Sequence, residues 1–149
     1  MLPEEGEILE LDELWSFVQS KNNARWVWIA LCRRTRQVVA SEVGDRSEAT
    51  CLRLWQKIPS SYKKSIVYSD FWIAYSKVIP DEQHRAVGKE SGQTNHVERW
   101  NNTLRQRLGR FVRKTLSFSK CEKMHDLCLL IYLHYYNTYM APGIANNAR

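Results

Sequence analysis

The sequence predicts a single α/β domain in which helices cover a mixed β-sheet. Three apolar segments near its start are separated by short polar breaks, which is typical of an antiparallel meander. Strand-like and helix-like segments then alternate, which favours strands connected through helices. With 149 residues, a hydrophobic fraction of 44% and six tryptophans, the chain can bury one substantial core.

The meander consists of three predicted strands. Residues 8–18 (ILELDELWSFV) are rich in β-forming residues, and apolar side chains fill nearly all positions of one parity. A polar break at 19–23 precedes 24–32 (ARWVWIALC), a continuous apolar run typical of a central strand. A second polar turn leads into the third strand, 38–43, which ends before Gly44. Short breaks of this kind indicate that consecutive strands pair with each other.

Helical and extended segments alternate in the middle of the chain. Ser47 is placed as the N-cap of a helix that ends at Pro59. A short buried strand (KSIVYSD) ends at Asp70, and a short helix then runs to Pro80. A last short strand at 83–87 and a glycine-containing loop lead into the following helix. This order places the strand ending at Asp70 beside the first strand, at the centre of the sheet.

A basic helix is predicted over 94–120. Apolar residues recur along it at spacings of three and four: Val97, Trp100, Leu104, Leu108 and Phe111. Turned away from that stripe, Glu98, Asn102 and Arg105 share one face.

A final helix follows, with Ser119 and Glu122 at the spacing of a capping box. Its apolar stripe indicates core or a subunit contact and comprises Cys121, Met124, Cys128, Ile131, Tyr132 and Tyr135. We therefore expect 8–138 to form the folded domain, with a flexible acidic N-terminus at 1–7 and a disordered tail at 139–149.

Charge is unevenly distributed along the chain. The formal net charge is +6, but residues 1–13 hold six acids and no Lys or Arg, so the remainder carries 22 basic residues against ten acids. Such a basic remainder indicates a polyanionic partner, most often nucleic acid, although a solvated Arg-rich surface is the alternative. The candidate DNA contacts are the cations of the basic helix: Arg99, Arg105, Arg107, Arg110, Arg113 and Lys114.

Composition also argues against two classes of protein. No apolar run approaches the ~20 residues of a membrane span, and the start lacks a signal-type segment, so we expect a cytoplasmic protein. The four cysteines form no CxxC pair, which argues against a zinc site or a disulfide framework and favours buried free thiols.

Three carboxylates are candidate catalytic residues. Asp12 lies within a strand that is apolar on both faces, where an unpaired charge is costly. Taken alone, Asp70 is more often a helix N-cap and Glu98 a first-turn carboxylate stabilised by the helix dipole. If the strands of Asp12 and Asp70 are neighbours and the Glu98 helix packs across their end, all three share one pocket.

Carboxylates gathered in one pocket predict a site for two Mg²⁺ or Mn²⁺ ions. Without a cation, mutual repulsion raises at least one pKa and lowers stability. Hard divalent ions prefer carboxylate oxygens, and two of them roughly 4 Å apart support an in-line displacement at phosphorus. Arg105 lies two turns beyond Glu98 on the same face, where it is expected to hold a DNA phosphate.

The chain resembles transposases of the insertion element one family, which have a DDE active site. Four segments carry the resemblance, in the family's order: LDELWSFV, YSDFW, NHVERWNNTLRQRL and RKTLSFSK. Asp12 matches the first Asp of the family, in its D-E-x-W strand. Asp70 matches the second, between a Y-[ST] dipeptide and a nearby Trp. Glu98 matches the Glu of E-R-x-N-x-x-L-R, and Trp100 stands where the family often has His.

The resemblance covers nearly all of residues 9–137 and implies a ribonuclease H-like fold. It also implies the catalytic domain of a DNA transposase, which cleaves a phosphodiester with two metal ions and joins the freed 3′-hydroxyl to target DNA. Family members carry an upstream zinc-finger and helix-turn-helix segment that recognises the element ends. We therefore expect such a segment as a fusion or a separate chain, a homo-oligomer on DNA, and a bacterial, nucleoid-associated location.

Two alternatives remain open from the sequence. The first is a nuclease on the same fold, which cuts DNA but does not join it. The second is a non-catalytic DNA-binding or regulatory fragment that competes with a full transposase. Metal-dependent strand joining distinguishes them, because the nuclease yields nicks only and the fragment yields neither product.

Overall fold

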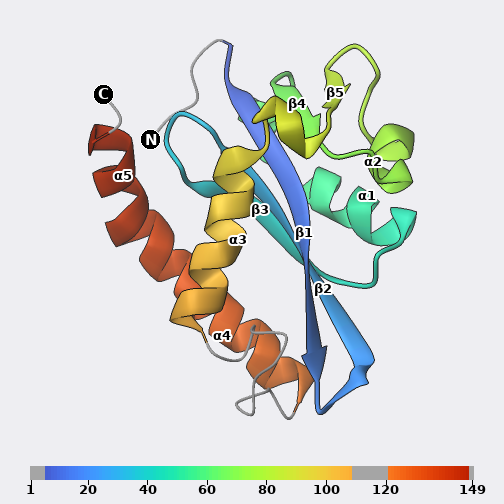
Figure 1. Ribbon diagram of the computed structural model, residues 1–149, viewed down its shortest axis with the longest axis vertical. Helices are drawn as coiled ribbons and strands as arrows, with labels where there is room; N and C mark the ends of the chain where they lie inside the picture. The colour runs from blue at the N-terminus through green and yellow to red at the C-terminus, as the bar shows by residue number, and fades with distance from the viewer. Residues whose placement is uncertain (1–5, 109–120, 148–149) are drawn as a thin grey trace.

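The computed structural model describes residues 6–108 and 121–147 (Figure 1). Within these ranges, five strands form one sheet in the order β3-β2-β1-β4-β5. The strands are β1 (Ile8–Val18), β2 (Ser20–Cys32), β3 (Val38–Gly44), β4 (Ile66–Ser69) and β5 (His84–Ala86). The first three pair antiparallel, whereas β4 pairs in parallel with β1, and β5 with β4. The predicted mixed sheet is confirmed, in the arrangement of a ribonuclease H-like fold.

Helices lie on both sides of this sheet (Figure 1). One side carries α1 (Glu48–Lys57) and α2 (Ile73–Val78). The other carries α3 (Asn95–Arg107), α4 (Glu122–Tyr135) and α5 (Ala141–Asn147), with a π-helical turn at Tyr136–Met140 between the last two. The molecule therefore has three layers, with the sheet in the middle.

Alternation along β1 builds a separate core on each side of the sheet. Leu9 and Leu11 are buried beneath α1 and α2, whereas Leu14 is buried beneath α3 and α4. Successive side chains of a strand point to opposite faces. Asp12 therefore lies on the α3 side with Leu14, and Glu13 lies on the α1 and α2 side.

The predicted polar break at 19–23 belongs to a β-hairpin instead. β2 begins directly after Gln19, whose φ of 64° is left-handed, and Val18 pairs with Ser20. The first five residues of β2, Ser20–Ala24, are exposed. Polar composition at this point marks the solvated end of a long strand rather than a loop.

Both ends of the predicted domain extend further than expected. Residues 139–147, predicted as part of a disordered tail, are helical instead, and α5 buries Ala141 and Ala145 one turn apart. Small side chains at this spacing let the helix pack closely against its neighbours. Glu7, predicted as part of a flexible N-terminus, is 6% exposed and forms an ion pair with Arg34.

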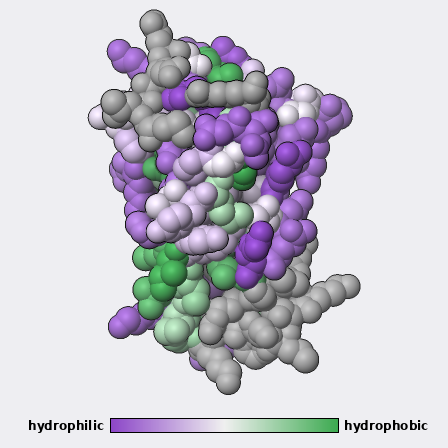
Figure 2. Space-filling view, turned by 90° about the vertical axis from the view of Figure 1, so that its left-hand side faces the viewer, coloured by the Kyte–Doolittle hydropathy of each residue, from purple (hydrophilic) through white to green (hydrophobic). Residues whose placement is uncertain are grey.

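α4 presents an apolar face to solvent. Met124, Ile131 and Tyr135 of the predicted stripe are exposed, while Leu129 and Tyr132 are buried against the sheet. Figure 2 shows hydrophobic side chains gathered on this side of the molecule. Residues 127–133 of this helix are all apolar, so spacing alone does not identify the face that packs on the sheet.

Two compositional expectations can be compared with the structure. Among the described residues, no helix is long and apolar enough to cross a membrane. All four cysteines are free, as predicted. Cys32 and Cys51 are buried as predicted, but Cys121 is exposed, so the prediction of a buried thiol is wrong for Cys121.

Candidate active site

The parallel pairing of β1 with β4 sets Asp12 beside Asp70. The last paired residues are Glu10 and Tyr68. Asp12 lies two residues further along β1, and Asp70 lies two residues after Tyr68, just beyond the end of β4. β4 ends at Ser69, while β1 continues in its pairing with β2. The sheet therefore opens at the carboxyl end of β4, the kind of crevice where α/β proteins bind ligands.

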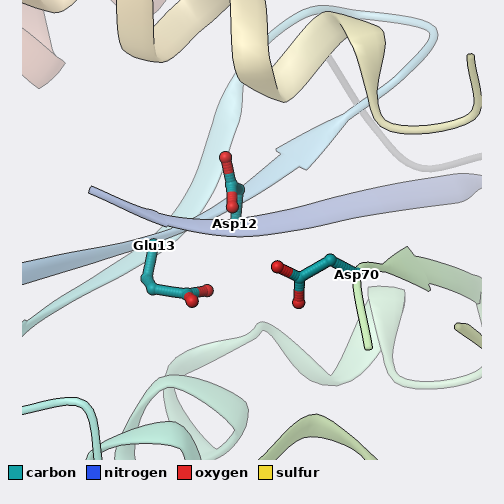
Figure 3. A group of neighbouring side chains, drawn as sticks. All are labelled: Asp12, Glu13 and Asp70. Atoms are coloured by element: carbon teal, nitrogen blue, oxygen red, sulfur yellow. The ribbon is translucent and has the colours of Figure 1, made fainter. Parts of the chain in front are cut away.

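Three acidic side chains meet in this crevice (Figure 3). One carboxylate oxygen from each of Asp12, Glu13 and Asp70 lies within 4.8 Å of the others. Asp12 points from β1 toward α3, while Glu13 points from the opposite side of the strand toward Asp70. The group thus combines the first two predicted carboxylates with a third that was not predicted.

These side chains line a cavity of about 400 Å³. Glu98, Asn101 and Arg105 line it from α3, and Arg46 lines it from the α1 side of the sheet. The structure therefore brings the three predicted carboxylates, Asp12, Asp70 and Glu98, to one cavity.

Asp12 is held in a setting that disfavours its negative charge. Burial, and next the neighbouring charge of Glu13, raises the pKa of Asp12 to about 7, with smaller contributions from Asp70 and Glu98. Asn101 Nδ2 donates a hydrogen bond to Asp12 Oδ2 at 2.9 Å and orients the carboxylate. Because no described cation forms an ion pair with Asp12, a bound divalent ion would supply the missing compensation.

The donor set fits a hard divalent cation. Asp70 uses Oδ1 to accept the backbone N–H of Trp72 at 2.9 Å, and its Oδ2 accepts no hydrogen bond from a described residue. Among the described residues, Glu98 accepts only a long hydrogen bond, from Thr94 Oγ1 at 3.4 Å. Carboxylate oxygens with this much free capacity suit Mg²⁺ or Mn²⁺ better than softer metals. The N-cap of α2 is Trp72 and not Asp70, so the alternative role of Asp70 as the N-cap of this helix is wrong, although Asp70 does accept the Trp72 N–H.

The raised pKa of Asp12 predicts a pH-dependent stability. The folded protein retains a proton that an unfolded Asp loses near its ordinary pKa of 3.8, so stability should fall as pH rises from about 4 to about 7. Asp12→Asn removes this effect and should stabilise the metal-free protein by roughly 1–3 kcal/mol more at about pH 8 than at about pH 5. Denaturant unfolding at both pH values measures the difference. An equal change in unfolding free energy at both pH values would contradict the raised pKa of Asp12.

Glu10 fixes the start of the helix that carries Glu98. Its side chain is fully buried, and Oε1 accepts the backbone N–H groups of His96 at 2.9 Å and Val97 at 3.3 Å. Thr94 occupies the N-cap position but makes no capping hydrogen bond. The carboxylate of Glu10 therefore satisfies the first-turn N–H groups from a neighbouring strand.

The predicted DNA contacts on the basic helix do not share one face. Arg105 lines the cavity, but Arg99 lines a smaller hollow elsewhere on α3, and Arg107 lies near Tyr132 of α4. These three arginines therefore lie on different sides of α3, because adjacent positions turn by about 100°. Glu98, Asn102 and Arg105, which were predicted to share a face, all line the same cavity. Arg110, Arg113 and Lys114 lie outside the described residues.

Sequence reasoning missed three residues that shape the site: Glu10, Glu13 and Arg46. Glu10 shares the parity of Asp12, and Glu13 follows it directly, so acids inside an apolar strand were a usable signal for both. Arg46 lies 33 residues after Glu13, and its sequence context gives no indication of their contact.

Sequence comparison finds relatives that match nearly the whole domain. The family model of the IS1 transposases matches residues 7–139. The insertion element iso-IS1n protein InsB of Shigella dysenteriae is 38% identical over 119 residues, which cover 80% of this chain and 88% of that relative.

Two further relatives match over 125 residues, or 84% of this chain, at 37% identity. They are the IS1 protein InsB of Shigella flexneri, of which 92% is covered, and the IS1 4 protein InsB of Escherichia coli (strain K12), of which 72% is covered. The matched segment contains every strand of the sheet and the helix that carries Glu98. On this evidence the chain is a member of the IS1 transposase family.

Proposed function

We propose that this domain cuts a DNA phosphodiester and joins the freed 3′-hydroxyl to target DNA, using two Mg²⁺ or Mn²⁺ ions held by Asp12, Asp70 and Glu98. One observation carries the proposal: these three carboxylates line one cavity, and none of them forms an ion pair with a described cation. When bound, the ions would polarise the reacting phosphate and stabilise the charge on the leaving oxygen.

The protein's own residues would position the reaction. Asn101 orients Asp12, and the backbone N–H of Trp72 orients Asp70. Asp12 must lose its proton to act as a ligand, which its pKa of about 7 permits near neutral pH. Arg105, on the same side of the cavity as Glu98, would bind a phosphate of the DNA strand.

The proposal includes partners that lie beyond this domain. The DNA would comprise the element ends and the target, and a homo-oligomer would hold both. An upstream zinc-finger and helix-turn-helix segment, as a fusion or a separate chain, would select the ends. The reaction would take place at the bacterial nucleoid, where the element ends and the target DNA lie.

A strand-joining assay tests the proposed reaction. The protein is incubated with Mg²⁺, target DNA and a pre-nicked donor duplex, so that end recognition is not required. Joined products support the proposal. New nicks in the target or donor without joining would indicate the nuclease, and DNA binding without either product would indicate the regulatory fragment.

DNA binding should be non-specific and salt-dependent. If cations of the domain neutralise phosphates, log affinity falls roughly linearly with log salt. Replacing Arg105 with Gln should lower that slope by about one, and removing Arg110 and Arg113 should weaken binding equally for any sequence. Fluorescence anisotropy at several salt concentrations measures the slopes. Binding that is flat in salt would show that these cations serve a protein partner instead.

A further inference from the structure

Glu13 differs from the other carboxylates at the cavity because both of its oxygens already have side-chain partners, one of them a cation. Its Oε1 accepts hydrogen bonds from Arg46 Nε at 3.0 Å and Nη2 at 2.9 Å, and its Oε2 accepts one from the Tyr75 hydroxyl at 2.5 Å. The Glu13 side chain is only 2% exposed. A carboxylate bound at both oxygens and paired with a guanidinium is a poor metal ligand, so another role must explain it.

The consequence of these contacts is a rigid arginine. The Arg46 guanidinium carbon lies 4.0 Å from the ring centre of Trp72 and 4.8 Å from that of Trp26. The Trp72 indole N–H also donates to the Arg46 backbone oxygen at 3.1 Å. Glu13 therefore holds one edge of the guanidinium, while two aromatic rings hold its position. Little rotamer freedom is left for Arg46 to lose when it binds a ligand.

Arg46 keeps unused hydrogen-bonding capacity. An arginine has five N–H donors, and Glu13 takes two of them, so three remain. None of these three has a partner among the described residues. The side chain is 38% exposed and lines the same cavity as Asp12 and Glu98. Two N–H groups on the edge of a fixed guanidinium match two oxygens of a phosphate.

Two arginines line this cavity from different elements of the fold. Arg105 lines it from α3, and Arg46 lines it from the α1 side. A DNA strand whose reacting phosphate lies at the carboxylates would place neighbouring phosphates toward these arginines. The two arginines are therefore positioned for different phosphates of one strand.

We propose that Arg46 binds a non-reacting phosphate of the DNA strand beside the cleavage point, and that Glu13, Trp26 and Trp72 are positioning residues for its guanidinium. The assignment rests on the proposed function, since it requires DNA in this cavity. It also makes Glu13 a residue that acts through Arg46 and not a metal ligand.

A phosphate-by-phosphate binding scan tests the contact. Single phosphates of a short donor duplex ending at the 3′-hydroxyl are replaced by uncharged methylphosphonate, and affinity is measured in Ca²⁺ by fluorescence anisotropy. Wild-type protein should lose roughly ten- to thirty-fold in affinity at one position near the 3′ end. Arg46→Gln should be weaker on unmodified DNA and show no further loss at that position.

Control variants separate the outcomes. Arg53→Gln changes an exposed arginine of α1 that does not line the cavity, and it should keep the wild-type profile. The double variant Glu13→Gln/Arg46→Gln removes both members of the ion pair, so it avoids leaving Glu13 uncompensated and should lose the same phosphate contact. Glu13→Gln alone should retain wild-type Mn²⁺ affinity.

Three results would overturn the assignment. If Arg46→Gln and the double variant keep the wild-type sensitivity at that position, Arg46 only neutralises Glu13. If Glu13→Gln loses Mn²⁺ binding, Glu13 is a metal ligand. If the wild-type profile is flat at every position, DNA does not enter the cavity and the proposed function fails as well.

Discussion

Glu98→Gln is expected to reduce the rates of DNA cleavage and strand joining by two or more orders of magnitude while leaving the fold intact. The change keeps the size and outline of the side chain but removes one negative charge from the cavity that Asp12 and Asp70 also line. Fewer charged oxygens would misplace the ions at the reacting phosphate. The metal-free protein should keep its stability or gain some, because repulsion within the cavity falls.

The same variant distinguishes a ligand from an ordinary first-turn carboxylate. If Glu98 only stabilises the helix dipole, activity stays near wild type and unfolding free energy falls by a few tenths to ~1 kcal/mol. Glu82→Gln is the matched control, since Glu82 is exposed and does not line the cavity. Strand joining on a pre-nicked donor and denaturant unfolding provide the two readouts. An active, slightly destabilised Glu98→Gln protein would refute the catalytic assignment.

Glu10→Ala is expected to have the largest effect on stability, about 3–5 kcal/mol. Besides the N–H groups of α3, Glu10 Oε2 accepts a hydrogen bond from Arg33 Nε at 2.9 Å and lies 2.7 Å from His96 Nδ1. The substitution leaves buried donors without an acceptor and leaves Arg33 without its carboxylate. The start of α3 should then fray and displace Glu98, so strand joining should fall with stability.

Two further variants make this prediction specific. Glu10→Gln keeps an oxygen for the N–H groups but loses the charge, so it should cost less, roughly 1–2 kcal/mol. Glu48→Ala removes an exposed acid that pairs with Lys77, and it should cost at most about 1 kcal/mol. Chemical denaturation measures all three. If Glu10→Ala is no more harmful than Glu48→Ala, Glu10 does not anchor α3.

Local patterns predicted the mixed sheet and the side of β1 on which Asp12 lies. Alternation along 8–18 placed Asp12 on the face opposite Leu9 and Leu11, and the structure confirms this placement. The strand ending at Asp70 was expected beside the first strand, and β4 does pair with β1. These features follow from burial and strand period, which a sequence carries directly.

Features that depend on contacts between distant segments could not be predicted. The capping of α3 by Glu10 and the ion pair of Glu13 with Arg46 join residues 86 and 33 positions apart. The buried face of α4 could not be predicted from spacing because residues 127–133 are all apolar. The helical tail could not be recognised from its pattern because its buried residues, Ala141 and Ala145, are small rather than strongly hydrophobic.

Anomalous diffraction from crystals of this protein grown with Mn²⁺ tests whether Asp12, Asp70 and Glu98 hold two metal ions. We expect two Mn²⁺ peaks roughly 4 Å apart, contacted by carboxylate oxygens of these three residues, with Glu13 still bound to Arg46. Crystals of Glu98→Gln should show weaker or displaced peaks. An empty cavity at millimolar Mn²⁺, or an ion held by Glu13 while Glu98 points away, would contradict this assignment.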